Sequence, residues 1–385
     1  MIRTDLAVIG GGVAGTTATL EAAKAGFKVV LVERKKEPGK PVVCGEFLPS
    51  LDAVEFAADV LPELRRAYDI MRDFMVHETS RIVVEVKGYR TLEFDLKGFV
   101  IDKEALTRSL IEEAEGLGAR VLLGERARRV ERCDEGFVVH TSREKLSASV
   151  VIGADGFPSL TATCLSMKSG YSLADWAIAG HVRAEGAFDE DTVWMYIDPK
   201  TTTGGYAWVI PKSRRIANVG LGVRAIYARS KVDVRAALNG FLRLARIERT
   251  VEGPYYKVIP VGGLVEIPTV KGALLVGDSA GLVNPINGGG IPLAVASGIA
   301  AARYLSGDCY EDFLERASKL LRWGLTYRYL VDAFYEGFSV GKLGMILTPT
   351  GLALKVLKGE ETVMLAVGRI VKTLLEWKGI LRGRR

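Results

Sequence analysis

The first 33 residues constrain the fold more than any other stretch of this chain. An apolar run over residues 5–9 is typical of a buried strand, and a G-x-G-x-x-G pattern follows it directly. Small and apolar residues then recur at helical spacing over residues 13–26, and a second apolar run covers residues 28–32. Strand, glycine turn, helix and strand in this order predict a βαβ unit at the start of a parallel sheet.

The glycines and one acidic residue make this unit a candidate dinucleotide site. Gly10 makes the turn, Gly12 lets the backbone approach a pyrophosphate, and Gly15 lets the helix pack closely on the strand. Glu33 stands 18 residues after Gly15 and ends the second strand, where it can bind ribose hydroxyls. It favours an unphosphorylated ribose, as in FAD or NAD rather than NADP. A glycine turn that only packs a helix is the alternative, and the complete context disfavours it.

Two further apolar runs end in glycine turns. The run over residues 147–153 stops at Gly153-Ala154-Asp155-Gly156, and the run over residues 273–276 stops at Gly277-Asp278. The carboxyl ends of parallel strands meet at one edge of a sheet, which is where ligands bind. We therefore expect the three turns to lie together.

The chain turns again after Asp278. Asn284-Pro285 and the triple glycine at 288–290 leave the backbone bare, and Pro292 opens a helix of small residues. Such a helix start directs backbone N–H groups and the positive end of the helix dipole at one point, which suits an anionic or electron-rich ligand. A loop that merely packs a helix against a sheet would use the same residues, so both interpretations stay open for this stretch alone.

Residues 170–265 have a sequence pattern that differs from that of the βαβ unit. Aromatic and β-branched runs separated by turns predict an antiparallel sheet, with a turn at residues 212–215. A further hairpin is expected over residues 81–96. The aromatic side chains in this region either fill a sheet core or form the wall of a large apolar pocket. They are Trp194, Tyr196, Tyr206, Trp208, Tyr255 and Tyr256.

The C-terminal region reads as helical from residue 310, with amphipathic patterns at 323–338 and 362–377 and a basic end, KGILRGRR. A basic amphipathic segment can lie on an anionic membrane or pack on its own domain, and the sequence leaves both open. No uninterrupted apolar run reaches the ~18 residues of a membrane span. The net charge is +6, yet no nucleic-acid-binding signature occurs, so nucleic acid is disfavoured as a partner.

Four cysteines occur far apart and without CxxC spacing. This distribution indicates neither a metal site nor a disulfide framework, and it favours a reduced, cytoplasmic protein. Cys44 is adjacent to Gly45 in a loop with two prolines. It is either a small buried apolar residue, the usual role of a free cysteine, or a thiol held beside the dinucleotide.

These motifs together resemble a known group. The order GGGVAG…E, GADG and GDSAG…NP…GGGI resembles the FAD-dependent hydroxylase-type flavoproteins over most of the first 305 residues. Within that group, the Cys-Gly pair, the YAWVIP strand and the segment GDSAGLVNPINGGGIPLAVASG resemble the geranylgeranyl reductase family. That family includes archaeal enzymes that saturate the isoprenoid chains of membrane lipids. The late glycine motif is the most specific of these features.

The chain departs from the family pattern at a few positions. Thr203 stands where the aromatic strand usually begins with proline, and Ile210 stands where it usually has phenylalanine. The GADGFPS motif also lacks the arginine that commonly follows it in the hydroxylase group. None of these departures falls on a residue expected to hold the flavin.

The resemblance implies an α/β fold with three parts and FAD as the cofactor. A discontinuous Rossmann-like FAD-binding domain would cover residues 1–75, 98–165 and 270–309. A mainly antiparallel substrate domain would cover 76–97 and 166–269, followed by a C-terminal helical region at 310–385. The expected FAD-binding residues are Gly10, Gly12, Ala14, Gly15, Glu33, Arg34, Cys44, Gly45, Asp155, Gly277, Asp278, Gly288, Gly289, Gly290 and Ile291.

Reduction of an isolated alkene asks for particular side chains. No carbonyl is present to accept charge, so hydride addition to one carbon has to be coupled to protonation of the other, with partial carbocation character between them. Tyr206 and Trp208 could supply electron-rich rings, each worth ~1–2 kcal/mol toward a desolvated positive charge. Cys44, a thiol that is normally protonated at neutral pH, is the expected acid or the group that positions it.

Other functions fit the same scaffold. A flavin monooxygenase or halogenase of a small aromatic, a flavoprotein that passes electrons to a quinone, and a catalytically silent nucleotide-binding module are the alternatives. Scattered cysteines mean that the chain could not itself carry an iron–sulfur cluster. The expected partners are a prenyl lipid, the membrane surface at the inner face, and an electron donor such as NAD(P)H, ferredoxin or another reductant.

Overall fold

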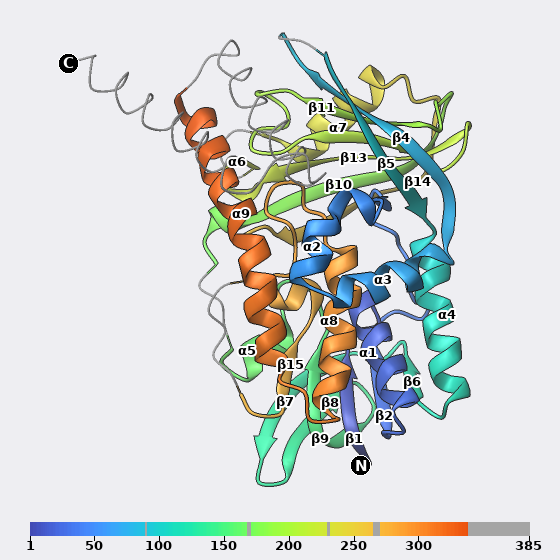
Figure 1. Cartoon of the computed structure of the whole chain (residues 1–385), viewed down its shortest axis with the longest axis vertical. Helices are drawn as coiled ribbons and strands as arrows, with labels where there is room; N and C mark the ends of the chain where they lie inside the picture. The colour runs from blue at the N-terminus through green and yellow to red at the C-terminus, as the bar shows by residue number, and fades with distance from the viewer. Residues whose placement is uncertain (89–90, 168–170, 229–231, 265–269, 338–385) are drawn as a thin grey trace, which may run out of the picture.

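The computed structural model describes residues 1–88, 91–167, 171–228, 232–264 and 270–337. Two β-sheets organise these residues, one toward the lower end of the molecule in Figure 1 and one toward the upper end, with a long helix along one side. The predicted α/β class is confirmed.

The lower sheet has seven strands and carries the predicted βαβ unit. Its order is β6 (Arg120–Leu123), β2 (Val29–Glu33), β1 (Ile2–Ile9), β9 (Lys145–Gly153), β8 (Gly136–Thr141) and β7 (Ala127–Cys133), while β15 (Ala273–Leu275) pairs with β9. The β6, β2, β1, β9 and β15 pairings are parallel, and the β7–β8–β9 pairings are antiparallel. The predicted strand limits are therefore right to within a few residues.

The glycine turns lie at one edge of this sheet, as predicted. In the sheet β9 has β1 on one side and β15 on the other. Backbone hydrogen bonds continue past the strand ends, because Ala154 N donates to Ile9 O at 2.8 Å and Val276 N donates to Gly153 O at 3.0 Å. The strands thus deliver all three turns to the same carboxyl edge.

Two helices that begin at this edge pack tightly against each other (Figure 1). They are α1 (Val13–Lys24) and α8 (Ile291–Tyr304). A Cβ atom on Gly298 would lie 2.5 Å from the Ala14 carbonyl oxygen, so only glycine allows this approach. The small-residue pattern of the late helix therefore serves packing along its length, which leaves its N-terminus for another role.

The upper sheet has eight strands and is mainly antiparallel. Its order is β14 (Arg249–Pro260), β10 (Trp176–Glu185), β13 (Ile216–Arg224), β12 (Ala207–Pro211), β11 (Thr192–Ile197), β4 (Met75–Val86), β5 (Thr91–Ile101) and β3 (Phe47–Pro49). The β4–β5 and β12–β13 hairpins are confirmed. The pattern did not predict β3 or the parallel pairing of β11 with β4.

The sheets cross the expected domain limits. β3 joins the upper sheet although it lies within the expected 1–75 segment, and β5 runs to Ile101 rather than stopping at residue 97. The three-part division itself stays a prediction.

The remaining helices are η1 (Asp52–Val54), α2 (Glu55–Val60), α3 (Glu63–Arg72), α4 (Lys103–Gly116), α5 (Leu160–Cys164), η2 (Leu173–Asp175), α6 (Ala225–Ala228), α7 (Val234–Leu244), η3 (Gly277–Ala280) and α9 (Tyr310–Gly337).

The two faces of the upper sheet divide the aromatic residues. Trp194 and Tyr196 pack with Phe241 of α7 in one apolar core. Tyr206 and Trp208 belong to the opposite face, in a cluster with Ile210 and residues of β4 and β5. Both sets thus pack in apolar cores, on opposite faces of the sheet, and a pocket wall at Tyr206 and Trp208 stays a prediction.

The helix predicted from residue 310 is confirmed as α9. The second amphipathic pattern, at 362–377, and the basic end lie outside the described residues. Within the described residues, no helix combines the length and apolar character needed to cross a membrane.

Candidate functional site

Protein contacts explain two of the three glycines in the first turn. Gly10 has a φ of +106°, and a Cβ there would lie 2.3 Å from Ala154 O; a Cβ on Gly15 would lie 1.9 Å from Gly10 O. A Cβ on Gly12 would meet nothing within 4 Å. Gly12 therefore opens onto free space at the start of α1, which has no side-chain cap. This bare helix start fits a pyrophosphate.

Glu33 is buried beside this turn. Its Oε2 accepts a hydrogen bond from Gly11 N at 2.6 Å, and its Oε1 accepts one from Lys35 N at 2.7 Å. These bonds fix the carboxylate at the end of β2, and each oxygen keeps a further lone pair for a hydroxyl donor. Arg34 is exposed next to it. Binding of a ribose by this pair stays a prediction.

The late turn presents a second bare helix start. Gly290 is the N-cap of α8 and makes no side-chain cap, and Ile291 is the first helical residue. Gly288 has a φ of +69°, and Gly289 N donates to Asn287 Oδ1 at 2.9 Å. Gly277 lies against Ala14 of α1, because a Cβ on Gly277 would be 3.0 Å from the Ala14 Cβ. The same Cβ would lie 3.5 Å from the Cβ of Ala294 in α8, so Gly277 lies between the starts of the two helices.

Asp278 forms an ion pair that the sequence did not predict. Lys257 of β14 donates from Nζ to Asp278 Oδ2 at 2.7 Å, so the pair links the two sheets. Burial by itself would raise the Asp278 pKa, but the charge and hydrogen bond of Lys257 outweigh it and hold that pKa below its ordinary value. The Asp278 charge in turn raises the pKa of Lys257. Both groups are charged at neutral pH.

Asp155 is occupied by the protein. Its carboxylate accepts hydrogen bonds from Ser159 Oγ, Ser279 Oγ and both the N–H and hydroxyl of Thr161, at 2.7 to 3.1 Å. These bonds hold the start of α5 against η3. They give Asp155 a structural role, and its expected contact with FAD stays a prediction.

The Cys44-Gly45 loop packs on the aromatic strand β12. A Cβ on Gly45 would lie 2.4 Å from Ile210 Cδ1 and 3.8 Å from Trp208 Nε1. Cys44 is half-buried, and its Sγ accepts a hydrogen bond from Glu46 N at 3.4 Å. The S–H hydrogen is therefore still available for donation. Ile210, which departs from the family pattern, contacts this turn.

Tyr206 connects β12 to the late glycine loop. Its hydroxyl donates to Asn287 O at 2.6 Å, and its ring lies 5.8 Å from that of Trp208. Burial, with a smaller effect of Cys44, raises the pKa of Tyr206, so the phenol stays protonated. The structure thus brings together Tyr206, Trp208, the Cys44 loop and the late glycine loop.

This face of the upper sheet also holds buried polar atoms that lack partners in the described part of the chain. They are Trp208 Nε1, His181 Nδ1 and Asn218 Oδ1. His181 and Trp208 both lie opposite Gly220 of β13, on its two sides. Burial and then the charge of Arg183 lower the pKa of His181 to about 3, so this imidazole is neutral. Buried polar atoms usually have protein or water partners, which sets these three apart from the hydrogen-bonded polar atoms around them.

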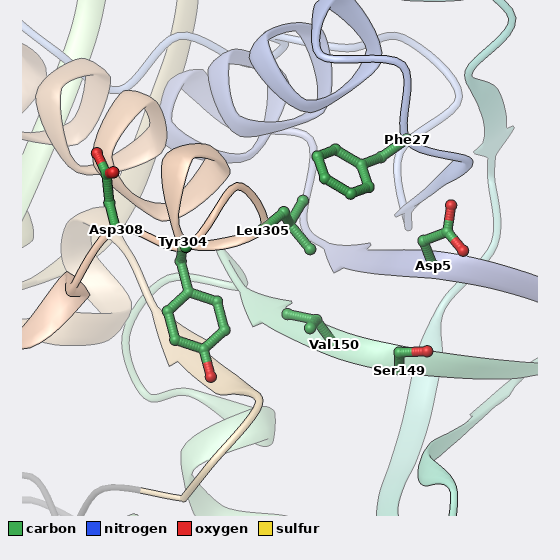
Figure 2. Close-up of a pocket in the computed structure, with 8 residues that line it drawn as sticks. Asp5, Phe27, Ser149, Val150, Tyr304, Leu305 and Asp308 are labelled. Atoms are coloured by element: carbon green, nitrogen blue, oxygen red, sulfur yellow. The ribbon is translucent and has the colours of Figure 1, made fainter.

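A separate cleft of about 590 Å³ lies at the opposite edge of the seven-stranded sheet. Figure 2 shows Phe27, Tyr304 and Leu305 around it, together with Asp5 of β1 and Val150 of β9. Tyr304 ends α8, so this cleft is far along that helix from its N-terminus at Gly290. None of the residues expected to bind FAD lines it.

Comparison with known proteins agrees with this geometry. Residues 5–163 match the FAD-dependent oxidoreductase family, and residues 177–255 match the geranylgeranyl reductase catalytic domain. A digeranylgeranylglycerophospholipid reductase from Methanothermobacter thermautotrophicus is 32% identical over 99% of this chain and 98% of its own. Another, from Methanopyrus kandleri, is 29% identical over 94% of each chain.

Solved structures share the fold. A geranylgeranyl bacteriochlorophyll reductase-like protein from Thermoplasma acidophilum is 24% identical, with a TM-score of 0.77 over 97% of this chain and 99% of its own. A flavin-dependent brominase is 15% identical, with a TM-score of 0.68 over 98% of this chain and all of its own. The fold is therefore common to reductases and halogenating enzymes, and the residues within it have to separate them.

Proposed function

Because this chain belongs to the geranylgeranyl reductase family of FAD-dependent oxidoreductases, we propose that it saturates C=C bonds in the geranylgeranyl chains of membrane lipids or of their precursors. Its substrate class follows the relatives named digeranylgeranylglycerophospholipid reductase. The proposal includes a role for Cys44 as the proton donor.

One observation carries the proposal: the Cys44-Gly45 turn packs on Trp208 and Ile210, on the same sheet face from which Tyr206 bonds the late glycine loop. This arrangement supports a reaction in which a thiol and aromatic rings face a cofactor held at the glycine turns. It is an arrangement for protonating an apolar substrate in a dry site.

The residues expected to hold FAD fit that group. Gly12 leaves open space at a bare helix start, and the charged Lys257–Asp278 pair lies beside Gly290 at the other one. FAD, when bound and reduced, supplies a hydride. The role of Glu33 is to bind the ribose, and that of Asp278 is to bind the ribityl or pyrophosphate part.

The chain's own residues perform the remaining steps. Cys44 Sγ holds the proton that goes to one alkene carbon while a hydride reaches the other, and the resulting thiolate takes a proton back from solvent. Tyr206 and Trp208 stabilise the partial positive charge by ~1–2 kcal/mol each. The apolar cluster around Trp208 keeps water from this side of the site, and burial of the prenyl chain would contribute ~0.8 kcal/mol per CH₂.

The lipid substrate implies contact with a membrane. We propose peripheral contact, in keeping with the net charge of +6 and an apolar substrate that resides in the bilayer. An external reductant, NAD(P)H, ferredoxin or another donor, would renew the electrons after each hydride transfer.

The test is reduction of a defined lipid by the purified protein. Anaerobically reduced holoprotein is incubated with geranylgeranyl lipids, and the lipids are extracted and weighed by mass spectrometry. We expect a mass gain of two for each double bond reduced. No gain with several prenyl substrates would refute the proposal, and oxygen-dependent NAD(P)H consumption with a hydroxylated or halogenated aromatic product would support the monooxygenase or halogenase alternative instead.

A further inference from the structure

Glu46, directly after the Cys44-Gly45 pair, is a fully buried carboxylate that the mechanism above does not use. Its side chain is 0% exposed, and its partner Lys212 is 12% exposed. Three donors bond it at 2.8 Å: Lys103 N to Oε1, and Lys212 Nζ and Asn218 Nδ2 to Oε2. A buried charge is costly unless it is paired and hydrogen-bonded, and this one is both.

The backbone of Glu46 gives no reason for a glutamate. Its φ is +62°, in the left-handed region that favours glycine and costs other residues about 1 kcal/mol. The conformation is held by Ile101 N, which donates to Glu46 O at 3.0 Å. A strained residue of this kind persists where its surroundings fix it, often at functional sites. The side chain, rather than the backbone, therefore explains the glutamate.

The same contacts reach Cys44 through two routes. Glu46 N donates to Cys44 Sγ at 3.4 Å. Asn218 Nδ2 donates both to Gly45 O, at 3.1 Å, and to the Glu46 carboxylate. Since both of these neighbours are acceptors, the amide nitrogen of Asn218 has to face them, and the orientation of the amide is fixed.

These bonds attach the loop to three separate elements. Lys103 begins α4, Lys212 lies in the turn between β12 and β13, and Asn218 lies on β13. The loop thus has a fixed position against the sheet face that carries Trp208. A thiol that has to reach one carbon of an alkene benefits from this rigidity, because proton donation depends on hydrogen-bond reach.

We propose that Glu46 is the positioning residue for the Cys44 thiol. Its carboxylate, clamped by Lys212, Asn218 and the start of α4, sets the direction of the Cys44-Gly45 turn without touching substrate or flavin. This inference rests on the proposed function for the value of the thiol, but its structural part is independent of any reaction.

The test compares Glu46→Gln and Glu46→Gly with Glu37→Gln. The glutamine removes the charge and places an NH₂ group against at least one of the three donors, whereas glycine keeps the left-handed backbone without strain and removes the carboxylate. Glu37 is an exposed carboxylate near the same loop and serves as the matched control. All variants are used as full-length, FAD-loaded protein.

The readout is the alkylation rate of each cysteine with iodoacetamide, resolved by peptide mass spectrometry without substrate. In both Glu46 variants we expect the Cys44 rate to rise by about threefold or more, while Cys164, which is half-buried like Cys44, and the exposed Cys133 and Cys309 keep their rates. Glu37→Gln should match the wild type. Equal Cys44 rates in all proteins would overturn the proposal, and so would an equal rise at Cys164, which would indicate general unfolding.

Kinetics separate this proposal from the function on which it rests. Turnover of a geranylgeranyl lipid should fall by roughly 10- to 100-fold in kcat with little change in KM, because a small misplacement of a reacting group has that effect. If Cys44 alkylation responds but no lipid is reduced even by the wild type, positioning stands and the proposed function fails. If the Glu46 variants do not fold, Lys212→Met, at the edge of the cluster, has to raise the Cys44 rate for the proposal to survive.

Discussion

On the face of the eight-stranded sheet that α7 covers, Phe241 stacks on Trp194 and Tyr196, with ring centroids 5.7 and 5.8 Å apart. On the opposite face of the same sheet, Trp208 Nε1 and His181 Nδ1 are buried without a partner in the described residues. Strand alternation supplies large side chains to both faces. The difference lies in what covers them.

The comparison shows how a site can be distinguished from a core built of similar residues. A helix of the same chain packs against the first face, so its aromatic rings serve stability, and Tyr196 and Phe241 also line a cleft of about 510 Å³. The second face meets glycine turns, a cysteine loop and the Lys257–Asp278 ion pair, and it keeps unsatisfied polar atoms. We call the first the α7 face and the second the Cys44 face. We therefore expect substitutions on the α7 face to change stability and substitutions on the Cys44 face to change binding or turnover.

The largest expected effect is a loss of stability on the α7 face. Phe241→Ala should lower the free energy of unfolding by ~3–5 kcal/mol, because it removes a buried ring that stacks on two others. Denaturant unfolding measures the loss. Turnover per folded, FAD-loaded molecule should be unchanged, and a fall in that quantity would break the distinction between the faces.

The second-largest expected effect is a loss of turnover on the Cys44 face. Cys44→Ser should lower turnover by about 100-fold, since a hydroxyl is a much weaker acid than a thiol. The visible flavin spectrum and the denaturation midpoint should stay as in the wild type. Reduction of geranylgeranyl lipid, followed by mass spectrometry, gives the rate, and wild-type turnover in this variant would remove Cys44 as the proton donor.

A third prediction concerns pH and His181. Burial lowers its pKa to about 3 from 6.5, so between these values the unfolded chain binds a proton that the folded protein does not. Stability should therefore fall as the pH falls below 6.5, by ~1.4 kcal/mol per pH unit, or ~2 kcal/mol by pH 5. His181→Gln should lose this component of the slope. Denaturant unfolding at pH 7 and pH 5 gives the pH dependence of stability for both proteins. An equal dependence in the wild type and in His181→Gln would contradict a buried, neutral imidazole on the Cys44 face.

The smallest effect tests one hydrogen bond. Tyr206→Phe removes the 2.6 Å bond to Asn287 O and should weaken FAD binding by roughly twofold to tenfold, which corresponds to ~0.5–1.5 kcal/mol. Flavin fluorescence titration gives the dissociation constant. Tyr196→Phe removes a hydroxyl group from the α7 face and should leave the dissociation constant of FAD unaltered. A similar shift in both variants would mean that the effect does not come from the glycine loop.

The sequence predicted the parts of the site that depend on neighbouring residues. The turns at Gly10 and Gly277 follow from spacing along the chain, because a strand, a glycine and a helix start are local features. Lys257 and Glu46 were missed because their roles depend on distant partners. Lys257 bonds a residue 21 positions away, and Glu46 bonds Lys212 and Asn218 at separations of 166 and 172 positions.

The fold, like the site, could be predicted only where neighbouring residues determine it. Alternation along β11 and β12 predicts two faces but does not say which one α7 will cover, because that depends on a helix some thirty residues later. The parallel pairing of β11 with β4 likewise joins strands that are far apart in sequence and have no local signal for each other. Recognition of the late glycine motif, by contrast, needed only consecutive residues.

The late arrival of β15 has a consequence for how this protein is made. The ribosome releases β1, α1 and β9 long before it releases β15 and α8, which pair with β9 and pack on α1. Until then the nascent chain carries an open strand edge and an uncovered helix surface around Ala14, both of which favour association with other chains. The nucleotide-binding half therefore stays incomplete until residues 273–304 have left the ribosome.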